Sequence, residues 1–342
     1  MSEGAVTCGG EDVSQTLDAR SEADPVDRVT ASTSLGPGRC RRFAVMDTPN
    51  DIRAFLVSRR ARRTPADAGL PDFGGRRRVP GLRREEVALL AGMSVEYYVR
   101  LERGNAKGVS EAVLDGVSRA LDLDDAERTH LYDLVRAANE GAQPRRRRGP
   151  ARPQQVRPSV QQLLDAMADV PAFVQNGRLD VLATNRLGRA VFSEMSTQPQ
   201  RPANFGRFVF TSPQAPAFYR DWDDAAAQTV ALLRSEAGRS PHDRLLSDLV
   251  GELSVASEPF RSLWASHDVR QHSTGTKSIT HPVVGDLDLS YEAMALASGP
   301  GLQLVAYSAP PSSPTADALA VLASWSATAA EHAPTTGTGD AR

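Results

Sequence analysis

The chain has 342 residues, of which 40% are hydrophobic, and it contains neither a run of about 18 apolar residues nor the apolar segment of a secretory signal. It is therefore long enough for two domains, a membrane-spanning helix is excluded, and we expect a cytoplasmic protein without membrane contact. The net charge of −2 hides a basic block: residues 41–150 carry 22 Lys and Arg against 16 Asp and Glu, and both flanks are acidic. Such a block is typical of a nucleic-acid-binding region, or else of a solvated basic face.

The N-terminal extension, residues 1–45, is rich in Ser, Gly, Asp and Glu and shows no helical or strand period, so we predict that it is disordered. It contains both cysteines, Cys8 and Cys40, which are too few for a disulfide framework or a zinc site and are expected to be inert. The first helix is predicted over residues 50–62, where apolar residues recur at helical spacing.

A Pro- and Gly-rich loop over residues 64–82 leads into a helix-turn-helix pattern. Two short helices are predicted over residues 83–91 and 95–103. Gly92 ends the first helix, because glycine readily adopts the positive φ of a sharp turn. Ser94 is a favourable N-cap for the second helix.

Two further helices, over residues 110–121 and 125–138, complete an all-α domain of five helices that we place at residues 46–138. The next residues, 139–157, combine Pro, Gly and the run Arg145–Arg148. Because this composition favours an extended, solvated chain, we predict a basic linker there.

The C-terminal half begins with a predicted helix over residues 159–169. Residues 172–176 and 179–184 are predicted as two strands around Asn176-Gly177, a dipeptide that favours a hairpin turn. A mostly helical segment over residues 185–253 comes next.

Three more strands and a last helix are predicted after this segment, over residues 278–282, 286–291, 302–307 and 315–330. The pattern indicates an antiparallel sheet with helices packed on it, in a domain that we place at residues 158–330. Residues 331–342 are predicted to be a disordered tail. The whole chain is therefore expected to be α+β.

The segment from Arg83 to Gly104 resembles the helix-turn-helix of lambda-repressor-like (Xre-type) regulators. Its last residues, Leu101-Glu102-Arg103-Gly104, are similar to the end of that family's recognition helix. The arginine-rich lead-in from Gly74 to Val87 resembles the subset with a C-terminal MmyB-like ligand-binding domain. The alternative is a helical hairpin that does not bind DNA.

The resemblance implies that seven residues of this segment contact double-stranded DNA: Val95, Glu96 and Arg100 at base edges, and Ser94, Tyr97, Arg83 and Arg84 near phosphates. Arginine pairs bidentately with guanine, and glutamate either accepts a hydrogen bond from cytosine or stays solvated. Tyr97 either donates to a phosphate or only packs.

Outside the recognition helix, the arm formed by Arg76, Arg77 and Arg78 is expected to add phosphate contacts. The resemblance also implies that Glu102 pairs with an arginine of the first helix rather than with DNA. Arg59 and Arg60 are both candidates for that partner.

The C-terminal half resembles the MmyB-like family over roughly residues 158–325. The matching pieces include Pro171-Ala172-Phe173-Val174, Asn204-Phe205-Gly206-Arg207-Phe208, Leu263-Trp264, His267-Asp268-Val269 and His281-Pro282-Val283-Val284-Gly285. The resemblance implies a PAS-like α/β fold with an antiparallel sheet that holds a fatty-acid-like or other small apolar ligand. Thr184 departs from the pattern, because an aromatic residue is expected there.

Aromatic residues between the predicted elements would suit an apolar pocket, or equally a plain hydrophobic core. The candidate pocket residues are Phe173, Asn204, Phe205, Arg207, Phe208, Trp222, Trp264 and His281. Arg207 or His281 would anchor a carboxylate, or would belong to an internal hydrogen-bond network. The spacing of His267, His272 and His281 matches no compact metal motif, so we expect neither a metal nor another cofactor apart from a bound apolar molecule.

The sequence thus predicts a homodimeric transcription regulator that a small apolar ligand controls. In the alternative, the C-terminal domain only dimerises or binds a protein partner. No nucleophile elbow, Walker loop, dinucleotide fingerprint or zinc-protease motif is present, so we do not expect an enzyme. A pure protein-interaction module is the third possibility. A single small helix-turn-helix makes few DNA contacts, which is why a dimer is expected.

Overall fold

The computed structural model describes residues 47–71, 79–140, 154–197, 202–270 and 273–331. The N-terminal extension, the arm Arg76–Arg78, His272, the run Arg145–Arg148 and the C-terminal tail lie outside the described residues. Residues 47–140 are called the N-terminal region below, and residues 154–331 are called the C-terminal region. The predicted domain boundaries stay predictions.

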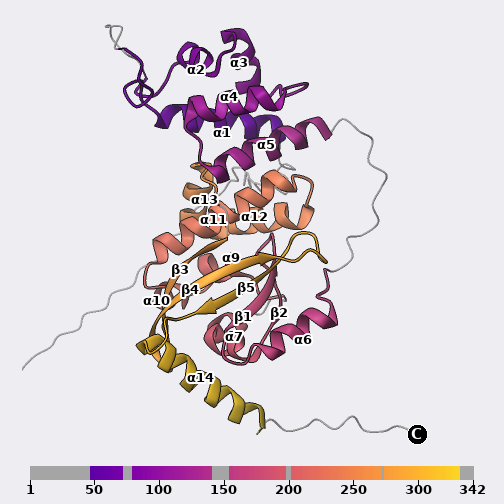
Figure 1. Ribbon diagram of the computed structural model, residues 1–342, viewed down its shortest axis with the longest axis vertical. Coiled ribbons are helices and arrows are strands. Elements are labelled where there is room, and N and C mark those ends of the chain that lie inside the picture. Colours follow the sequence, from indigo (N-terminus) through magenta and orange to yellow (C-terminus); the bar gives the residue numbers. More distant parts are fainter. Residues whose placement is uncertain (1–46, 72–78, 141–153, 198–201, 271–272, 332–342) are drawn as a thin grey trace, which may run out of the picture. The chain divides into compact units, whose positions relative to one another are not determined.

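The N-terminal region has the five predicted helices (Figure 1). They are α1 (Thr48–Arg62), α2 (Arg84–Ala91), α3 (Val95–Glu102), α4 (Glu111–Leu121) and α5 (Asp125–Glu140). Their apolar faces meet in one core whose fully buried side chains include Phe55, Tyr98, Leu101 and Leu131. The all-α prediction is confirmed, and the helix ends differ from the predicted ones by at most two residues.

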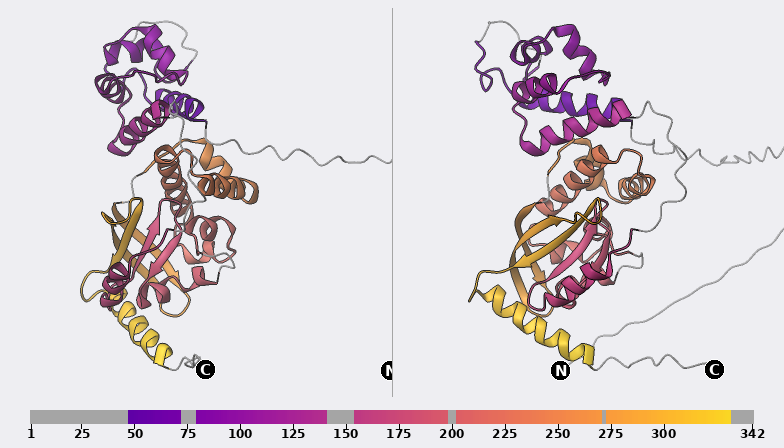
Figure 2. Two further views of the ribbon diagram at one scale, coloured as in Figure 1. Left: turned by 90° about the vertical axis from the view of Figure 1, so that its right-hand side faces the viewer. Right: turned by 45° about the vertical axis from the view of Figure 1, so that its right-hand side comes forward.

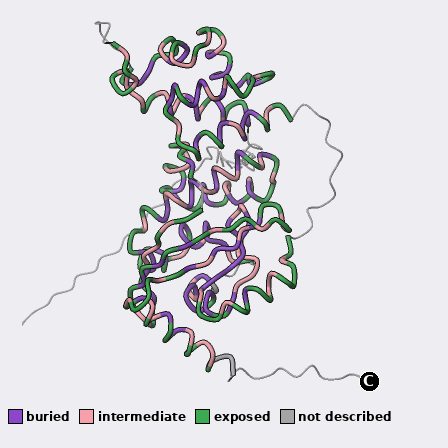
Figure 3. The backbone as a smooth tube through the Cα atoms, viewed as in Figure 1, coloured by how far each residue is buried: buried purple, intermediate pink, exposed green. Residues whose placement is uncertain are grey.

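The C-terminal region contains a five-stranded sheet in the order β2-β1-β5-β4-β3, in which every neighbouring pair is antiparallel. The strands are β1 (Ala172–Asn176), β2 (Val181–Thr184), β3 (Thr274–His281), β4 (Gly285–Ala295) and β5 (Leu302–Ser308). The expected antiparallel sheet and α+β class are confirmed. Strands β3 and β4 are longer than predicted, and the residues added to them, mainly 274–277 and 292–295, are exposed or half-buried (Figure 3).

Nine helices accompany this sheet among the described residues (Figure 2). They are α6 (Pro158–Ala166), α7 (Arg186–Val191), α8 (Ser193–Ser196), α9 (Phe205–Thr211), α10 (Ala215–Phe218), α11 (Trp222–Arg239), α12 (Arg244–Ala256), α13 (Glu258–Ala265) and α14 (Pro314–Glu331). The mostly helical character predicted for residues 185–253 is confirmed, whereas α13 lies beyond that segment and was not predicted.

The β1–β2 hairpin forms as predicted, but its turn is longer than a two-residue Asn-Gly turn. The Asn176 side chain accepts hydrogen bonds from the backbone N–H groups of Arg178 and Asp180, both at 3.0 Å. Leu179 takes the positive φ of 65°, and β2 starts only at Val181. The asparagine thus shapes the turn through its side chain, which the dipeptide signal alone does not specify.

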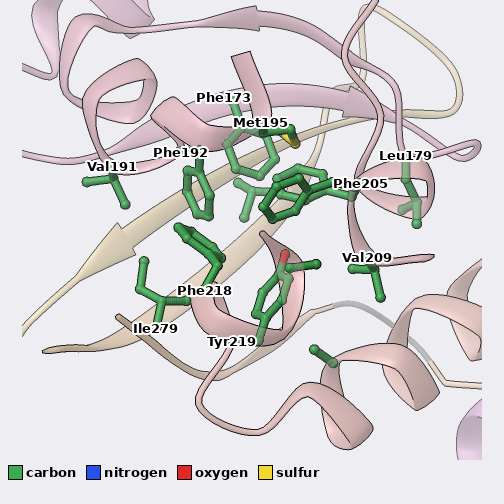
Figure 4. Packing of buried hydrophobic residues seen from close by; sticks show 14 of the residues in the cluster. Phe173, Leu179, Val191, Phe192, Met195, Phe205, Val209, Phe218, Tyr219 and Ile279 are labelled. Carbon is green, nitrogen blue, oxygen red and sulfur yellow. The ribbon is translucent and has the colours of Figure 1, made fainter. Parts of the chain in front are cut away.

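The central strands are buried on both faces, since residues of alternating orientation enter two different clusters. On one face, Phe173, Val305 and Tyr307 join a large cluster with α7 and α9–α12 (Figure 4). On the other face, Val174 and Leu304 pack in a small cluster with Leu164 of α6. The larger cluster is the main core of the C-terminal region.

Candidate nucleic-acid interface

The turn between α2 and α3 has the geometry that the sequence predicts. Gly92 adopts φ 68° and ψ 36°, and its N–H bonds back to carbonyls of α2. Ser94 then caps α3, because its Oγ accepts a hydrogen bond from the Tyr97 backbone N–H at 3.2 Å. These two local devices fix the angle at which α3 leaves the turn.

Helix α3 separates into a buried face and an exposed face. Tyr98, Leu101 and Glu102 are buried, and the first two belong to the N-terminal core. The opposite face borders a surface hollow of about 560 Å³, which is lined by Val95, Glu96, Val99, Arg100, Arg103 and Asn105. The buried face holds the helix in place, so the residues around the hollow are available for a partner.

Two neighbouring side chains of this exposed face contact each other. The guanidinium carbon of Arg100 lies 4.6 Å from the centroid of the Tyr97 ring. This cation–π contact restrains a long side chain, and so lowers the entropy that it loses on binding. Within the part of the chain that the structure describes, Arg83, Arg100 and Arg103 form no ion pair, so their charges are free to meet an anion.

Glu102 faces away from the hollow and is only 1% exposed. One of its oxygens lies 3.1 Å from Arg60 Nη2 of α1, and the other lies 2.9 Å from Arg84 Nε of α2. The expected arginine of the first helix is therefore Arg60 and not Arg59. The three charges tie α1, α2 and α3 together, which suits a structural role for this carboxylate.

Arg84 was predicted near phosphates, but its guanidinium is committed in part to Glu102. Two of its nitrogens donate to that carboxylate, at 2.9 and 3.3 Å, and the pairing raises the pKa of Arg84. Its side chain remains about half exposed. Arg83 differs from Arg84, because its side chain is exposed. Its backbone N–H donates to the Glu86 carboxylate at 2.6 Å, and this hydrogen bond caps α2.

The sequence interpretation missed three residues of the hollow, namely Val99, Arg103 and Asn105. Arg103 lies three residues after Arg100, and this spacing places both on one helix face. The signal was thus present in the sequence. The closing Leu-Glu-Arg-Gly motif, which contains Arg103, does not by itself assign this arginine a DNA contact.

The aromatic residues predicted to line a pocket in the C-terminal region pack against one another. The ring of Phe173 lies 5.0 Å from that of Phe205 and 5.7 Å from that of Phe192, measured between centroids (Figure 4). Phe208 is 1% exposed and contacts Phe218 at 5.4 Å. In this state the rings form a closed hydrophobic core.

The polar candidates of that pocket have partners within the region. Asn204 caps α9, because its Oδ1 accepts from the Arg207 backbone N–H at 3.0 Å. Arg207 donates to both carboxylate oxygens of Glu252 at 2.8 Å. Buried His281 uses both ring nitrogens, with Nε2 3.0 Å from the Ala190 carbonyl oxygen. These contacts match the internal hydrogen-bond network that the sequence analysis gave as the alternative to a carboxylate anchor.

The remaining candidates lie at the edge of the core. Trp222 donates from its indole nitrogen to the Val209 carbonyl at 3.0 Å. Trp264 stacks on Phe260, with 5.6 Å between the centroids. Thr184, the departure from the family pattern, bonds the Ala172 carbonyl at 3.1 Å.

Within the described ranges, no three His, Cys, Asp or Glu side chains gather as a metal site would require. Among the helices that the structure describes, none combines the length and the apolar character needed to cross a bilayer.

Comparison with known families identifies both regions. Residues 51–131 match the family described as a helix-turn-helix domain, and residues 156–322 match the family described as the MmyB-like transcription regulator ligand binding domain. The two regions together define a DNA-binding transcription regulator, and the protein belongs to this class. Within the class, it has the architecture predicted from the sequence, a helix-turn-helix followed by an MmyB-like ligand-binding domain. No curated protein matches the chain.

Proposed function

We propose that the protein reads specific sequences of double-stranded DNA through the exposed face of α3. One observation carries this proposal: α3 buries Tyr98 and Leu101 while it presents Glu96, Arg100 and Arg103 around an open hollow. A helix of this kind fits the major groove, where arginine recognises guanine and glutamate can accept from cytosine. Regulators of this class are typically not enzymes, and we propose no catalytic activity.

We further propose that the protein acts as a homodimer. A single α3 has only eight residues and offers few base contacts, whereas two copies would read half-sites about one helical turn apart. The DNA sequences that the protein selects should then contain an inverted repeat. A single asymmetric motif would contradict the dimer but not the DNA binding.

The first experiment selects duplexes from a random pool with the purified full chain, and then measures affinity by fluorescence anisotropy. We expect Arg100→Ala to weaken binding to the selected duplex by about 5- to 150-fold, equivalent to about 1–3 kcal/mol, with less effect on unrelated duplexes. Arg119 is a matched control, because it is an exposed arginine at the end of α4. Arg119→Ala should reduce affinity only slightly and equally for all sequences.

The comparison of Arg100→Ala with Arg119→Ala decides whether α3 reads bases. If Arg100→Ala and Arg119→Ala weaken binding to the same extent for every duplex, α3 does not read bases. If the unsubstituted chain enriches no duplex at low salt, the alternative of a protein-interaction module gains support.

For the C-terminal region we propose a small, fatty-acid-like apolar ligand. The support is the match of residues 156–322 to a ligand-binding family. The alternative is a region that only dimerises or binds a protein partner. Mass spectrometry of molecules released by denaturing the purified protein tests this, and a stoichiometric apolar compound is the expected result. An empty protein whose melting temperature lipids do not change would contradict the proposal.

A further inference from the structure

A group of charged and apolar residues connects the N-terminal region to the C-terminal region. Arg59 of α1 is 2% exposed and lies 2.8 Å from a carboxylate oxygen of Glu127 of α5. The same guanidinium donates to the carbonyl of His267 at 2.7 Å and to Asp268 at 3.3 Å. Val269 is 5% exposed and belongs to the hydrophobic core of the N-terminal region. His267 and Asp268 therefore bond to α1, while Val269 packs in that core.

A second contact joins α5 to α11. A Cβ atom added at Gly238 would lie 2.6 Å from two atoms of the His130 ring, so this face of α11 accepts the imidazole only because position 238 has no side chain. The His130 ring also packs edge-on against Phe55, with 5.2 Å between centroids. The histidine thus fills the space between α1 and α11.

Arg234 is the central charge on the α11 side. It is 4% exposed, its guanidinium lies 3.9 Å over the Trp264 ring, and its Nη1 lies 3.1 Å from His267 Nδ1. Burial lowers the pKa of Arg234 to about 10, while the nearby Asp51 of α1 acts in the opposite direction. Together, these residues define what we call the docking interface: Asp51, Arg59, Glu127, His130, Arg234, Gly238 and residues 267–269.

Two buried polar atoms of the docking interface lack a hydrogen-bond partner within the described ranges. Arg234 Nε and His130 Nδ1 are buried without a hydrogen-bond partner among the described residues. An unpaired buried polar atom costs stability, so these two atoms weaken the docking interface.

Helix α11 also links the docking interface to the aromatic core. Val230 and Leu233 of α11 are buried in the core cluster of the C-terminal region, whereas Arg234 and Gly238 contact the interface. Helix α13 makes a second link between the aromatic core and the docking interface. Its Phe260 packs in that core and stacks on Trp264, and the Arg234 guanidinium lies over the Trp264 ring. A change in the volume of that core would displace both helices.

We infer that the docking interface fixes the orientation of α3 relative to the C-terminal region, and that opening it weakens DNA binding. The interface uses α1, α5 and α11, so the exposed face of α3 stays available while the regions are docked. In a dimer, a fixed orientation sets the distance between two α3 helices, which must match the spacing of the half-sites. This inference rests on the proposed function and names how it would be regulated.

Two substitutions open the interface by different means. Gly238→Ala inserts a methyl group against His130 without changing a charge, and alanine is the better helix former within α11. Val269→Asp places a carboxylate where an apolar side chain is buried. Arg270→Gln is the matched control, since Arg270 is exposed, lies beside Val269 and only pairs with Asp224 at 3.5 Å.

The orientation is measured by pulsed electron spin resonance on the full chain. Nitroxide labels are attached at Lys107→Cys and Val255→Cys, two exposed positions, in a background with Cys8→Ser and Cys40→Ser. We expect a narrow distance distribution for the parent and for Arg270→Gln, and a broad one for Gly238→Ala and Val269→Asp. Circular dichroism confirms that each variant is folded, and either interface variant suffices if the other unfolds.

DNA affinity is measured on the same proteins with the selected duplex. We expect both interface variants to bind about 5- to 150-fold more weakly, the usual range for coupling between sites, and Arg270→Gln to bind as the parent does. A broad distribution in the parent, or equal affinity after the distribution has broadened, would overturn the inference. If the parent binds no duplex, the proposed function fails, whereas the label distances still show whether the regions are docked.

Discussion

At the scale of single residues, Arg59 and Arg60 show how neighbours in a helix serve different partners. Successive residues of a helix point about 100° apart, so Arg60 reaches Glu102 of α3 while Arg59 reaches Glu127 of α5. The sequence left both arginines open as the partner of Glu102. The choice depends on how α1 is rotated against α3, which is a tertiary property.

Another residue with a testable consequence is His130. Burial, together with the nearby Arg234 and Arg59, lowers the pKa of His130 to about 3, and His267 and Arg239 act in the same direction. The folded protein therefore keeps this imidazole neutral, whereas the unfolded chain takes up a proton below about pH 6.5. Protonation of His130 should therefore leave the free energy of unfolding unchanged above about pH 6.5. Below that pH, the free energy of unfolding should fall by about 1.4 kcal/mol for each pH unit.

Urea unfolding between pH 7 and pH 5 measures this dependence. Over the 1.5 units below pH 6.5 the expected loss from His130 is about 2 kcal/mol, and His130→Gln should remove it. Exposed His242 offers a control, since His242→Gln should keep the dependence of the unsubstituted protein. Equal slopes for His130→Gln and the unsubstituted chain would show that the imidazole is not held neutral.

At the scale of secondary-structure elements, the contact between α1 and α3 depends on Gly104. This glycine has a φ of 88°, and a Cβ atom there would lie 2.2 Å from the Pro49 carbonyl oxygen at the start of α1. Gly108 has a similar φ of 71°, but a Cβ atom would meet nothing within 4 Å. The two glycines separate backbone strain from a steric clash.

We predict that Gly108→Ala lowers the free energy of unfolding by about 1–2 kcal/mol, the cost of a left-handed conformation for alanine. Gly104→Ala should cost clearly more, because the backbone of α1 must also move. It should weaken DNA binding as well, since α3 is held by α1. Urea unfolding and anisotropy with the selected duplex measure the two effects. Equal losses for both variants would mean that α1 adjusts freely.

The elements themselves follow largely from local sequence signals. Gly92 and Ser94 mark the turn and the cap of α3, and both act through their nearest neighbours. The outer parts of β3 and β4 were missed because neither Thr274-Gly275-Thr276-Lys277 nor Glu292-Ala293-Met294-Ala295 alternates apolar and polar residues. Arg84 was assigned only to DNA, because its second partner, Glu102, lies 18 positions away along the chain.

At the scale of the whole molecule, the order of a helix-turn-helix and an antiparallel α+β region was predictable, since each has its own pattern of elements. Whether the aromatic cluster forms a ligand pocket or a closed core was not predictable. Phe173 and Phe205 would be apolar both in a ligand pocket and in a closed core, and only the distance between their rings distinguishes the two. The docking interface was equally hidden, because it joins residues about 200 positions apart.

Val269 has one more consequence. Because its side chain belongs to the hydrophobic core of the N-terminal region, that region does not contain all of its own interior. A chimaera that exchanged this helix-turn-helix for that of another regulator would bring a surface shaped for a different segment. The helix-turn-helix region and the C-terminal region of this protein are thus expected to have diverged as a matched pair, and not as interchangeable modules.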